Sequence, residues 1–267
     1  MAIRSYAATD IGLRRTLNED SYLACDALRL YMVADGMGGH VGGEIASRTA
    51  IQAIQDFIKQ VEADPSVTWP FSFVEGFSRI ENVILTAVRL ANQTLCRMVI
   101  ERPELAGMGT TIAGVRIYDQ HAAIFNVGDS RVYCARKDTL IQLTTDHSWV
   151  TEQLQRHVIS EEEARRHRWK NVITRALGSK TAVDVDVRTV DLDDGDTFVI
   201  CTDGLSGCVS DWAILESLRM YSDDLEQMCQ QLITQAKAAG GHDNITVVVL
   251  QYTADTPDVN STQPDAD

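Results

Sequence analysis

Three apolar segments of this chain each lead into an aspartate, and this pattern most restricts how the chain can fold. The segments "YMVA", "AAIFNV" and "FVIC" lead to Asp35, Asp129 and Asp203. Such strands belong in a protein interior, where an isolated carboxylate is costly unless it is neutralised, paired or bound to a metal. Gly36 and Gly204 directly follow two of the aspartates and allow a tight bend. Aspartate is also an ordinary turn residue, but three such positions together favour a common cause.

Further acidic residues stand at the ends of other predicted strands. Asp243 precedes the closing strand in "GGHDNITVVVLQY", and Glu19 with Asp20 follows the first strand in "RRTLNEDS". These carboxylates could meet at one rim of a sheet. Hard oxygen donors favour Mg²⁺, Mn²⁺ or Ca²⁺ over Zn²⁺, and the chain lacks HExxH, CxxC and the calcium-loop pattern. The sequence therefore favours Mg²⁺ or Mn²⁺ at a catalytic centre.

Charge and hydropathy narrow the possible partners and location. The chain has 267 residues and a net charge of −14, which disfavours nucleic acid and anionic membranes as partners. It has no run of eighteen apolar residues, and its first residues lack the apolar stretch of a secretory signal. We therefore expect a cytoplasmic protein without a membrane segment. In that compartment its six scattered cysteines are expected to be reduced.

Hydrophobic periodicity predicts the order of the elements. Apolar residues recur at helical spacing over 41–61 and 77–98, and helices are also expected over 148–167, 211–220 and 223–239. The block between 109 and 144 predicts a meander of antiparallel strands with turns at "YDQ" and "GDS". Strands clustered apart from helices favour antiparallel sheets covered by helices over alternating βαβ units. The polar, acidic residues 253–267 predict a disordered tail.

Other phosphate chemistries find little support in the sequence. The segment "CRMVIER" matches a Cys-five residues-Arg pattern, but it lies in a predicted helix and lacks the glycines of a phosphate cradle. No GxSxG elbow or GxxxxGK[ST] loop is present.

Eight blocks of the sequence together resemble the protein phosphatase 2C family, the metal-dependent serine/threonine phosphatases, in its bacterial form. They span about residues 4–252, in the order "TDIGLRRTLNEDS", "VADGMGGHVGGEIAS", "MGTTIAG", "NVGDSRVY", "LTTDHSWV", "NVITRALG", "CTDGLSG" and "HDNITVVV". The resemblance implies an α+β fold, a four-layer αββα sandwich whose two central antiparallel sheets are flanked by helices. It implies one phosphatase domain over 1–252, with a flap near 148–170.

The resemblance also implies a set of metal ligands. A binuclear Mn²⁺/Mg²⁺ centre is expected, with Asp35 bridging the two metals and the Gly36 carbonyl as a further ligand. Asp203 and Asp243 are expected to complete the first metal. The remaining expected contributors are Glu19 and Asp20 through bound waters, Asn244 as support, and Asp129 at a third, weaker metal shared with Asp203.

Two catalytic residues follow from the same resemblance. Arg15 matches the phosphate-binding arginine, whose planar fork suits phosphoryl oxygens, whereas Arg14 is expected to be a solvated surface residue. His40 is either the general acid for the leaving group or a structural histidine in a glycine-rich turn; Met37 fills the position where eukaryotic members carry histidine. In the flap, His157 replaces the usual glycine, which is unfavourable if the position needs a positive φ.

The function that the resemblance implies is hydrolysis of phosphoserine and phosphothreonine on proteins. A metal pair lowers the pKa of a water that attacks phosphorus in line, so no phosphoenzyme is needed. The expected enzyme opposes a bacterial serine/threonine kinase and is a monomer. The alternatives are a non-catalytic phosphoprotein-binding module and an acidic protein that only stores cations.

Overall fold

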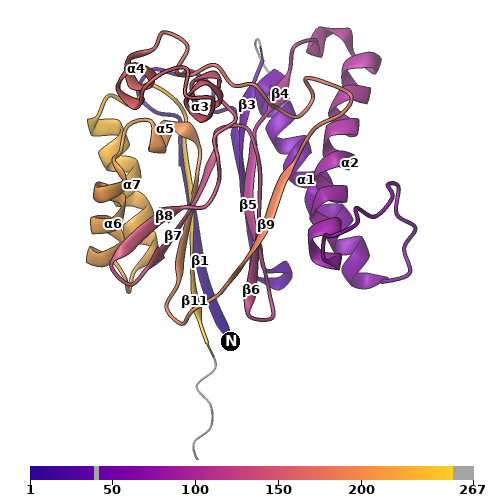
Figure 1. Ribbon diagram of the computed structural model, residues 1–267, viewed down its shortest axis with the longest axis horizontal. Helices are drawn as coiled ribbons and strands as arrows, with labels where there is room; N and C mark the ends of the chain where they lie inside the picture. The colour runs from indigo at the N-terminus through magenta and orange to yellow at the C-terminus, as the bar shows by residue number, and fades with distance from the viewer. Residues whose placement is uncertain (39–41, 255–267) are drawn as a thin grey trace, which may run out of the picture.

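Two antiparallel sheets face each other at the centre of the molecule (Figure 1). The computed structural model describes residues 1–38 and 42–254. The first sheet has the strand order β1-β11-β10-β7-β8, and the second has the order β2-β3-β5-β6-β9 with β4 added beside β3. The strands are β1 Ala2–Asp10, β2 Asp20–Cys25, β3 Leu30–Met37, β4 Gly109–Thr110, β5 Ile112–Tyr118, β6 His121–Val127, β7 Arg131–Arg136, β8 Thr139–Gln142, β9 Asp186–Asp191, β10 Thr197–Cys201 and β11 Ile245–Thr253.

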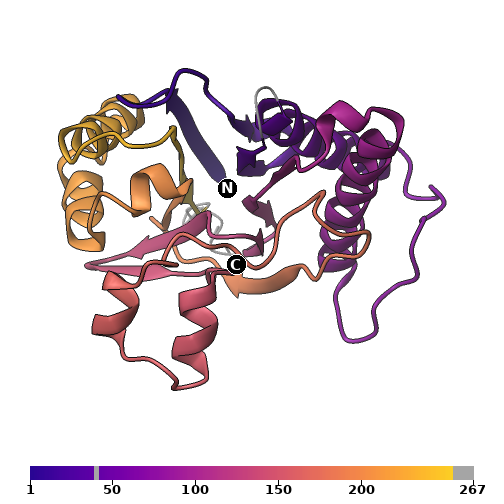
Figure 2. The same cartoon turned by 90° about the horizontal axis from the view of Figure 1, so that it is seen from above.

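Helices cover the outer face of each sheet, as Figure 2 shows from above. α1 and α2 pack on the second sheet, and α5, α6 and α7 pack on the first. The α-helices are α1 Gly42–Ala63, α2 Arg79–Glu101, α3 Trp149–Gln155, α4 Glu161–Arg166, α5 Asp203–Ser206, α6 Asp211–Met220 and α7 Leu225–Ala238. Short 3₁₀ turns lie at Asp26–Leu28 and Pro103–Leu105. The predicted four-layer αββα sandwich is confirmed.

The core explains why the strand sequences are apolar without alternation. Along β3, Leu30 and Met32 face the helices, whereas Tyr31 and Val33 face the opposite sheet. Both faces of the strand are therefore buried, and a strand of this kind reads as a continuous apolar run. α2 is the one helix of the described residues long and apolar enough to cross a membrane; here it packs against α1 and the sheet.

The strand block between 109 and 144 is not the meander that the sequence predicted. β5 and β6 form a hairpin in the second sheet, but β7 and β8 form a hairpin in the first. The "GDS" turn therefore carries the chain from one sheet to the other. Turn residues indicate where a strand ends, but they do not indicate which sheet the next strand joins.

Two further boundaries differ from the sequence prediction. The segment 148–167 contains two short helices, α3 and α4, rather than one helix, because the chain reverses between them. β11 extends to Thr253, so this residue belongs to the sheet rather than to the predicted tail. Residues 255–267 lie outside the described part of the chain.

Candidate metal centre

The predicted acidic residues gather around a cleft of about 370 Å³ at one end of the sandwich. Five carboxylates from separate parts of the chain line it, together with one cation, Arg15. The lining residues are Arg15, Glu19, Asp35, Gly36, Met37, Gly38, Thr111, Asp129, Asn171, Ile173, Asp203 and Asp243.

Asp35 lies inside β3, two residues before the strand ends, and Thr110 and Thr111 hold its backbone. Its N–H donates to Thr111 Oγ1 at 2.9 Å, and its carbonyl accepts from Thr111 N and Thr110 Oγ1, both at 2.9 Å. Burial raises the pKa of the Asp35 carboxyl well above its usual range, and the neighbouring aspartates, Asp20 first, raise it further. Thr111 is not among the predicted site residues, although it lies in the block "MGTTIAG".

Asp20 lies beneath the cleft rather than in its lining. It pairs across from Asp35 in the β2–β3 register and is only 9% exposed. One of its carboxylate oxygens accepts hydrogen bonds from Thr202 Oγ1 at 2.9 Å and Thr246 Oγ1 at 2.6 Å. Its other oxygen, Oδ1, has no partner. Burial raises the pKa of Asp20 to about 7 despite these hydrogen bonds.

Asp129 and Asp203 reach the cleft from the ends of β6 and β10. Asp129 stands in the turn that crosses between the sheets, and burial, with Asp203 nearby, raises its pKa to about 7. Asp203 is the first residue of α5, and its pKa is raised by burial and then by Asp243. Ionised together, these carboxylates would repel one another in a poorly solvated site, so the cluster favours either protons or cations.

The glycines after Asp35 and Asp203 are required by close backbone approach. A Cβ on Gly36 would overlap the carbonyl oxygen of Gly43 at the start of α1, and a Cβ on Gly204 would overlap the carbonyl oxygen of Asn244. Neither Gly36 nor Gly204 has a positive φ, so space rather than backbone conformation selects glycine at these two positions.

Arg15 and Asp243 form an ion pair at the mouth of the cleft. Arg15 Nη2 lies 2.7 Å from Asp243 Oδ2, and both side chains keep substantial exposure, 48% and 33%. The hydrogen bond that Arg15 donates to Asp243 raises the pKa of the Arg15 guanidinium. Each group serves as the other's counter-ion, and the exposure of Arg15 leaves its guanidinium accessible to an anion.

Asn244 fixes the loop that carries Arg15 and Glu19. Its Nδ2 donates to the carbonyls of Ile11 at 3.0 Å and Leu17 at 2.9 Å, and its Oδ1 accepts from Glu19 N at 2.9 Å. Asn244 lies outside the cleft lining, so its contacts are those of a positioning residue.

The donor set fits a hard divalent cation. Glu19 Oε1, Asp20 Oδ1 and Asp203 Oδ1 are buried oxygens that have no hydrogen-bond partner, which is costly unless a cation or proton satisfies them. Across residues 1–38 and 42–254, no three His, Cys, Asp or Glu side chains form a complete metal-binding group by themselves. Carbonyl oxygen and water would therefore supply part of the coordination, as Mg²⁺ normally accepts.

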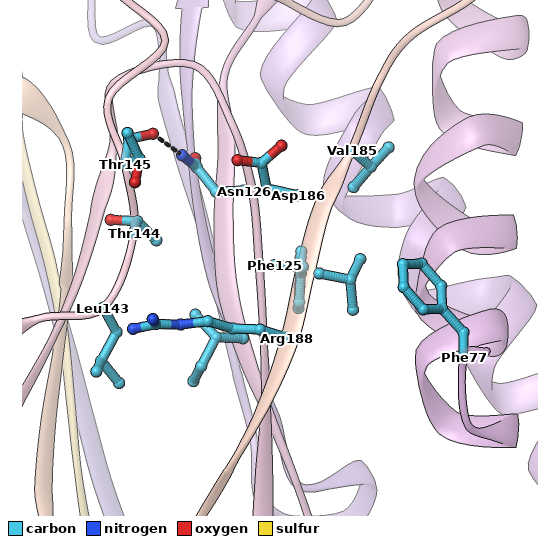
Figure 3. A pocket seen from close by; sticks show the side chains of 11 residues that line it. Phe77, Phe125, Asn126, Leu143, Thr144, Thr145, Val185, Asp186 and Arg188 are labelled. Atoms are coloured by element: carbon cyan, nitrogen blue, oxygen red, sulfur yellow. Dashed lines mark hydrogen bonds between the residues drawn. The ribbon is translucent and has the colours of Figure 1, made fainter. Parts of the chain in front are cut away.

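A second cavity, of about 360 Å³, lies beside β6 and β9 and is shown in Figure 3. Its one carboxylate, Asp186, already contacts His147 Nε2 at 3.1 Å and Arg175 Nη1 at 3.0 Å. Asn126 Nδ2 donates to the Thr145 carbonyl at 2.9 Å (Figure 3). These groups are engaged with one another, so the acidic cleft remains the candidate metal centre.

Two predicted residues, His40 and His157, are not part of the described cleft lining. His40 lies outside the described residues. His157 has φ +55°, so the flap position does adopt the left-handed conformation for which glycine is favoured. Asn171 and Ile173, which follow the flap, also line the cleft. Neither is among the predicted site residues, and the block "NVITRALG" is the one sequence signal that contains them.

Fold and cleft together define a class: helix-flanked two-sheet sandwiches with an oxygen-rich site for divalent cations at one end. The sequence model described as protein phosphatase 2C matches residues 14–245. The serine/threonine phosphatase stp of Listeria innocua is 35% identical over 246 residues, which are 91% of this chain and 93% of that protein. The chain belongs to the protein phosphatase 2C family.

Solved structures agree with this assignment. The crystal structure of the Mycobacterium tuberculosis serine/threonine phosphatase PstP/Ppp has a TM-score of 0.84 and 33% identity, over 95% of this chain and 100% of that one. The catalytic domain of PstP in complex with two manganese ions has a TM-score of 0.80 and 33% identity, over 94% and 99% of the two chains. Full-length PstP is longer: 99% of this chain aligns with 47% of it.

Proposed function

We propose that this protein hydrolyses phosphoserine and phosphothreonine on other proteins, using divalent cations held in the acidic cleft. The observation that carries the proposal is the meeting of five carboxylates and the accessible Arg15 around one cleft. The named activity of its relatives supports it, since they are serine/threonine phosphatases of the same family.

Asp35, the Gly36 carbonyl, Asp203 and Asp243 would hold two Mn²⁺ or Mg²⁺ ions. Glu19 and Asp20 would act through water, and Asp129 would take part in a weaker third site with Asp203. When bound, such cations supply Lewis acidity that makes hydroxide available near neutral pH. The partnerless oxygens of Glu19, Asp20 and Asp203 support this assignment, and the manganese-bound relative supports Mn²⁺ as the first choice of ion.

Arg15 would bind the phosphoryl group. Its planar guanidinium donates two parallel hydrogen bonds to phosphoryl oxygens and stabilises the negative charge that grows on them in the transition state. Its present partner Asp243 is also a proposed metal ligand. Binding of a cation at Asp243 would weaken the ion pair and release Arg15 for the phosphate, so the two events favour each other.

His40 would protonate the leaving serine or threonine oxygen, because its pKa range suits proton transfer near neutral pH. In His40→Asn, turnover of an alkyl phosphate should fall by about 100-fold, whereas an aryl phosphate, with its better leaving group, should be affected little. Equal losses on both substrates would instead assign His40 a structural role.

The function itself is tested with a phosphothreonine peptide and p-nitrophenyl phosphate in Mn²⁺ and in EDTA. Activity should require the metal and should fall by at least about 100-fold in Asp35→Asn and Asp203→Asn. Turnover that persists in EDTA would overturn the metal mechanism. A protein that binds Mn²⁺ and phosphopeptide without turnover would be a binding module, and one that binds only the cation would be a storage protein.

The proposal also predicts the source of the substrates, the location of the protein, its oligomeric state and its partners. We expect the substrates to be targets of a serine/threonine kinase, and the protein to act as a cytoplasmic monomer without a nucleic-acid or membrane partner. The net charge of −14 supports the last point.

A further inference from the structure

The flap concentrates positive charge in an otherwise acidic protein. Four of the six residues in "RRHRWK", positions 165–170, are lysine or arginine, whereas the whole chain carries a net charge of −14. Arg165 and Arg166 lie 3.3 Å from Glu161 and Glu162, respectively, which offset their charge. The two remaining cations of this run are Arg168 and Lys170, farther along the chain.

Arg168, Trp169 and Lys170, here termed the flap rim, are all exposed. The Arg168 guanidinium lies 4.7 Å from the centre of the Trp169 ring, in a cation–π contact. Lys170 forms no salt bridge with any residue in 1–38 or 42–254. Within residues 1–38 and 42–254, Arg168 likewise has no carboxylate partner, so both cations of the flap rim are available to an anionic ligand.

The flap rim is held in place by aromatic stacking. Trp149 stacks on His167 with ring centres 4.5 Å apart and meets Trp169 edge-on at 4.9 Å. The backbone N–H of Trp149 also donates to the Val172 carbonyl at 2.8 Å. Because the rim is ordered before any ligand arrives, less conformational entropy is lost on binding.

The flap rim stands next to the acidic cleft. Asn171, the residue after Lys170, lines the cleft. Burial and the nearby Asp203 raise the pKa of the Cys208 thiol, whereas Lys170 lowers it. Lys170 and Asp203 therefore share Cys208 as an electrostatic neighbour. Figure 1 shows α3 and α4 at the same end of the sandwich as β4 and α5.

We propose that the flap rim binds aspartate and glutamate side chains beside the phosphorylated residue, so that this enzyme prefers acidic phosphoprotein segments. The inference rests on the proposed function and names its substrate class. Elsewhere the field of a protein with charge −14 repels such segments, and the flap rim supplies a local attraction beside the cleft. Charge complementarity of this kind acts mainly on association and is weakened by salt.

The test uses three phosphothreonine peptides that differ only in flanking residues, which are aspartate, glutamine or lysine. At low ionic strength we expect kcat/KM for the aspartate peptide to exceed that of the glutamine peptide about tenfold, mainly through KM. The preference should shrink toward one in 0.5 M salt. The lysine peptide should be the poorest of the three.

The paired variant Arg168→Glu/Lys170→Glu should abolish or reverse the ratio between the aspartate and glutamine peptides. The control is Lys59→Glu, an exposed charge reversal near the far end of α1 that changes the net charge by half as much as the paired variant; it should leave the ratio unchanged. A ratio near one in the unmodified protein, or an equal change in Lys59→Glu, would overturn the inference. Absence of p-nitrophenyl phosphate turnover in Mn²⁺ would instead contradict the proposed function.

Discussion

The backbone N–H of Gly128 donates a hydrogen bond to Nδ1 of His147 at 3.0 Å, and the backbone N–H of His147 donates one to the Gly128 carbonyl at 2.9 Å. Gly128 precedes Asp129, the acidic residue of the turn between the sheets. His147 precedes the flap, and its carbonyl accepts from Thr174 N at 2.8 Å. The side chain and the backbone of His147 together thus join the Asp129 turn to both ends of the flap.

Removal of this side chain should weaken cation binding as well as stability. In His147→Ala the buried Gly128 N–H loses its acceptor, at a cost of about 1–3 kcal/mol in the free energy of unfolding, and Asp129 loses its fixed position. The Mn²⁺ concentration for half-maximal activity should therefore rise. His147→Asn, which keeps an acceptor near Nδ1, should recover part of the effect. His121→Ala, at the exposed His121–Asp191 pair, is the control; loss of stability with an unchanged Mn²⁺ requirement would argue against the coupling.

Without metal, the fold should lose stability as the pH rises from 5 to 7.5. The native carboxyls of Asp20 and Asp129 have pKa values of about 7, against 3.8 ordinarily. Between these values the native state holds more protons than the unfolded state, so the free energy of unfolding falls with increasing pH.

We expect a loss on the order of 2–4 kcal/mol in EDTA, measured by urea unfolding. Mn²⁺ should restore the stability at pH 7.5, and Asp129→Asn should reduce the slope. Asp10 and Glu81, whose pKa values are lowered, titrate below this window. The pKa of His147, which burial lowers from 6.5, opposes the trend inside the window, but the two aspartates outweigh this one group. Stability in EDTA that stays constant or increases with pH would contradict the prediction.

His157→Gly should stabilise the flap. The position has φ +55°, which strains a residue with a side chain, and its replacement should gain about 0.5–1 kcal/mol. The neighbouring Arg156→Gly, where φ is −85°, should instead be destabilising. Hydrogen exchange of the flap amides distinguishes the two, and equal protection changes in both variants would show that the left-handed conformation carries no cost.

Gly36→Ala should damage both the fold and the cleft. The new methyl group would overlap the Gly43 carbonyl and displace either β3 or the start of α1, at a cost of about 1–3 kcal/mol in the free energy of unfolding. Phosphatase activity and thermal midpoint should fall together. Gly42→Ala is the control, because the nearest atom to its new methyl group would be the Met108 Cβ at 3.3 Å. Equal losses of activity and thermal midpoint in both variants would show that overlap with the Gly43 carbonyl is not the cause.

The sequence by itself determined the parts of this protein that depend on local pattern. Apolar runs indicated strands buried on both faces, helical spacing indicated α1 and α2, and the aspartates beside Gly36 and Gly204 indicated an oxygen-rich site. Burial preference and backbone propensity act over a few residues, so they can be predicted from residues that are adjacent in the sequence. The roles of individual residues in the cleft came from the resemblance of eight blocks to a known family.

Only the tertiary structure decided how those parts meet. It placed β7 in the opposite sheet from β6, and it buried Asp20 under Thr202 and Thr246, which are 182 and 226 residues away along the chain. It also brought the flap rim beside the acidic cleft. Such contacts depend on which distant surfaces bury each other most favourably. A local stretch of sequence cannot rank these alternative packings, because each packing involves residues far away along the chain.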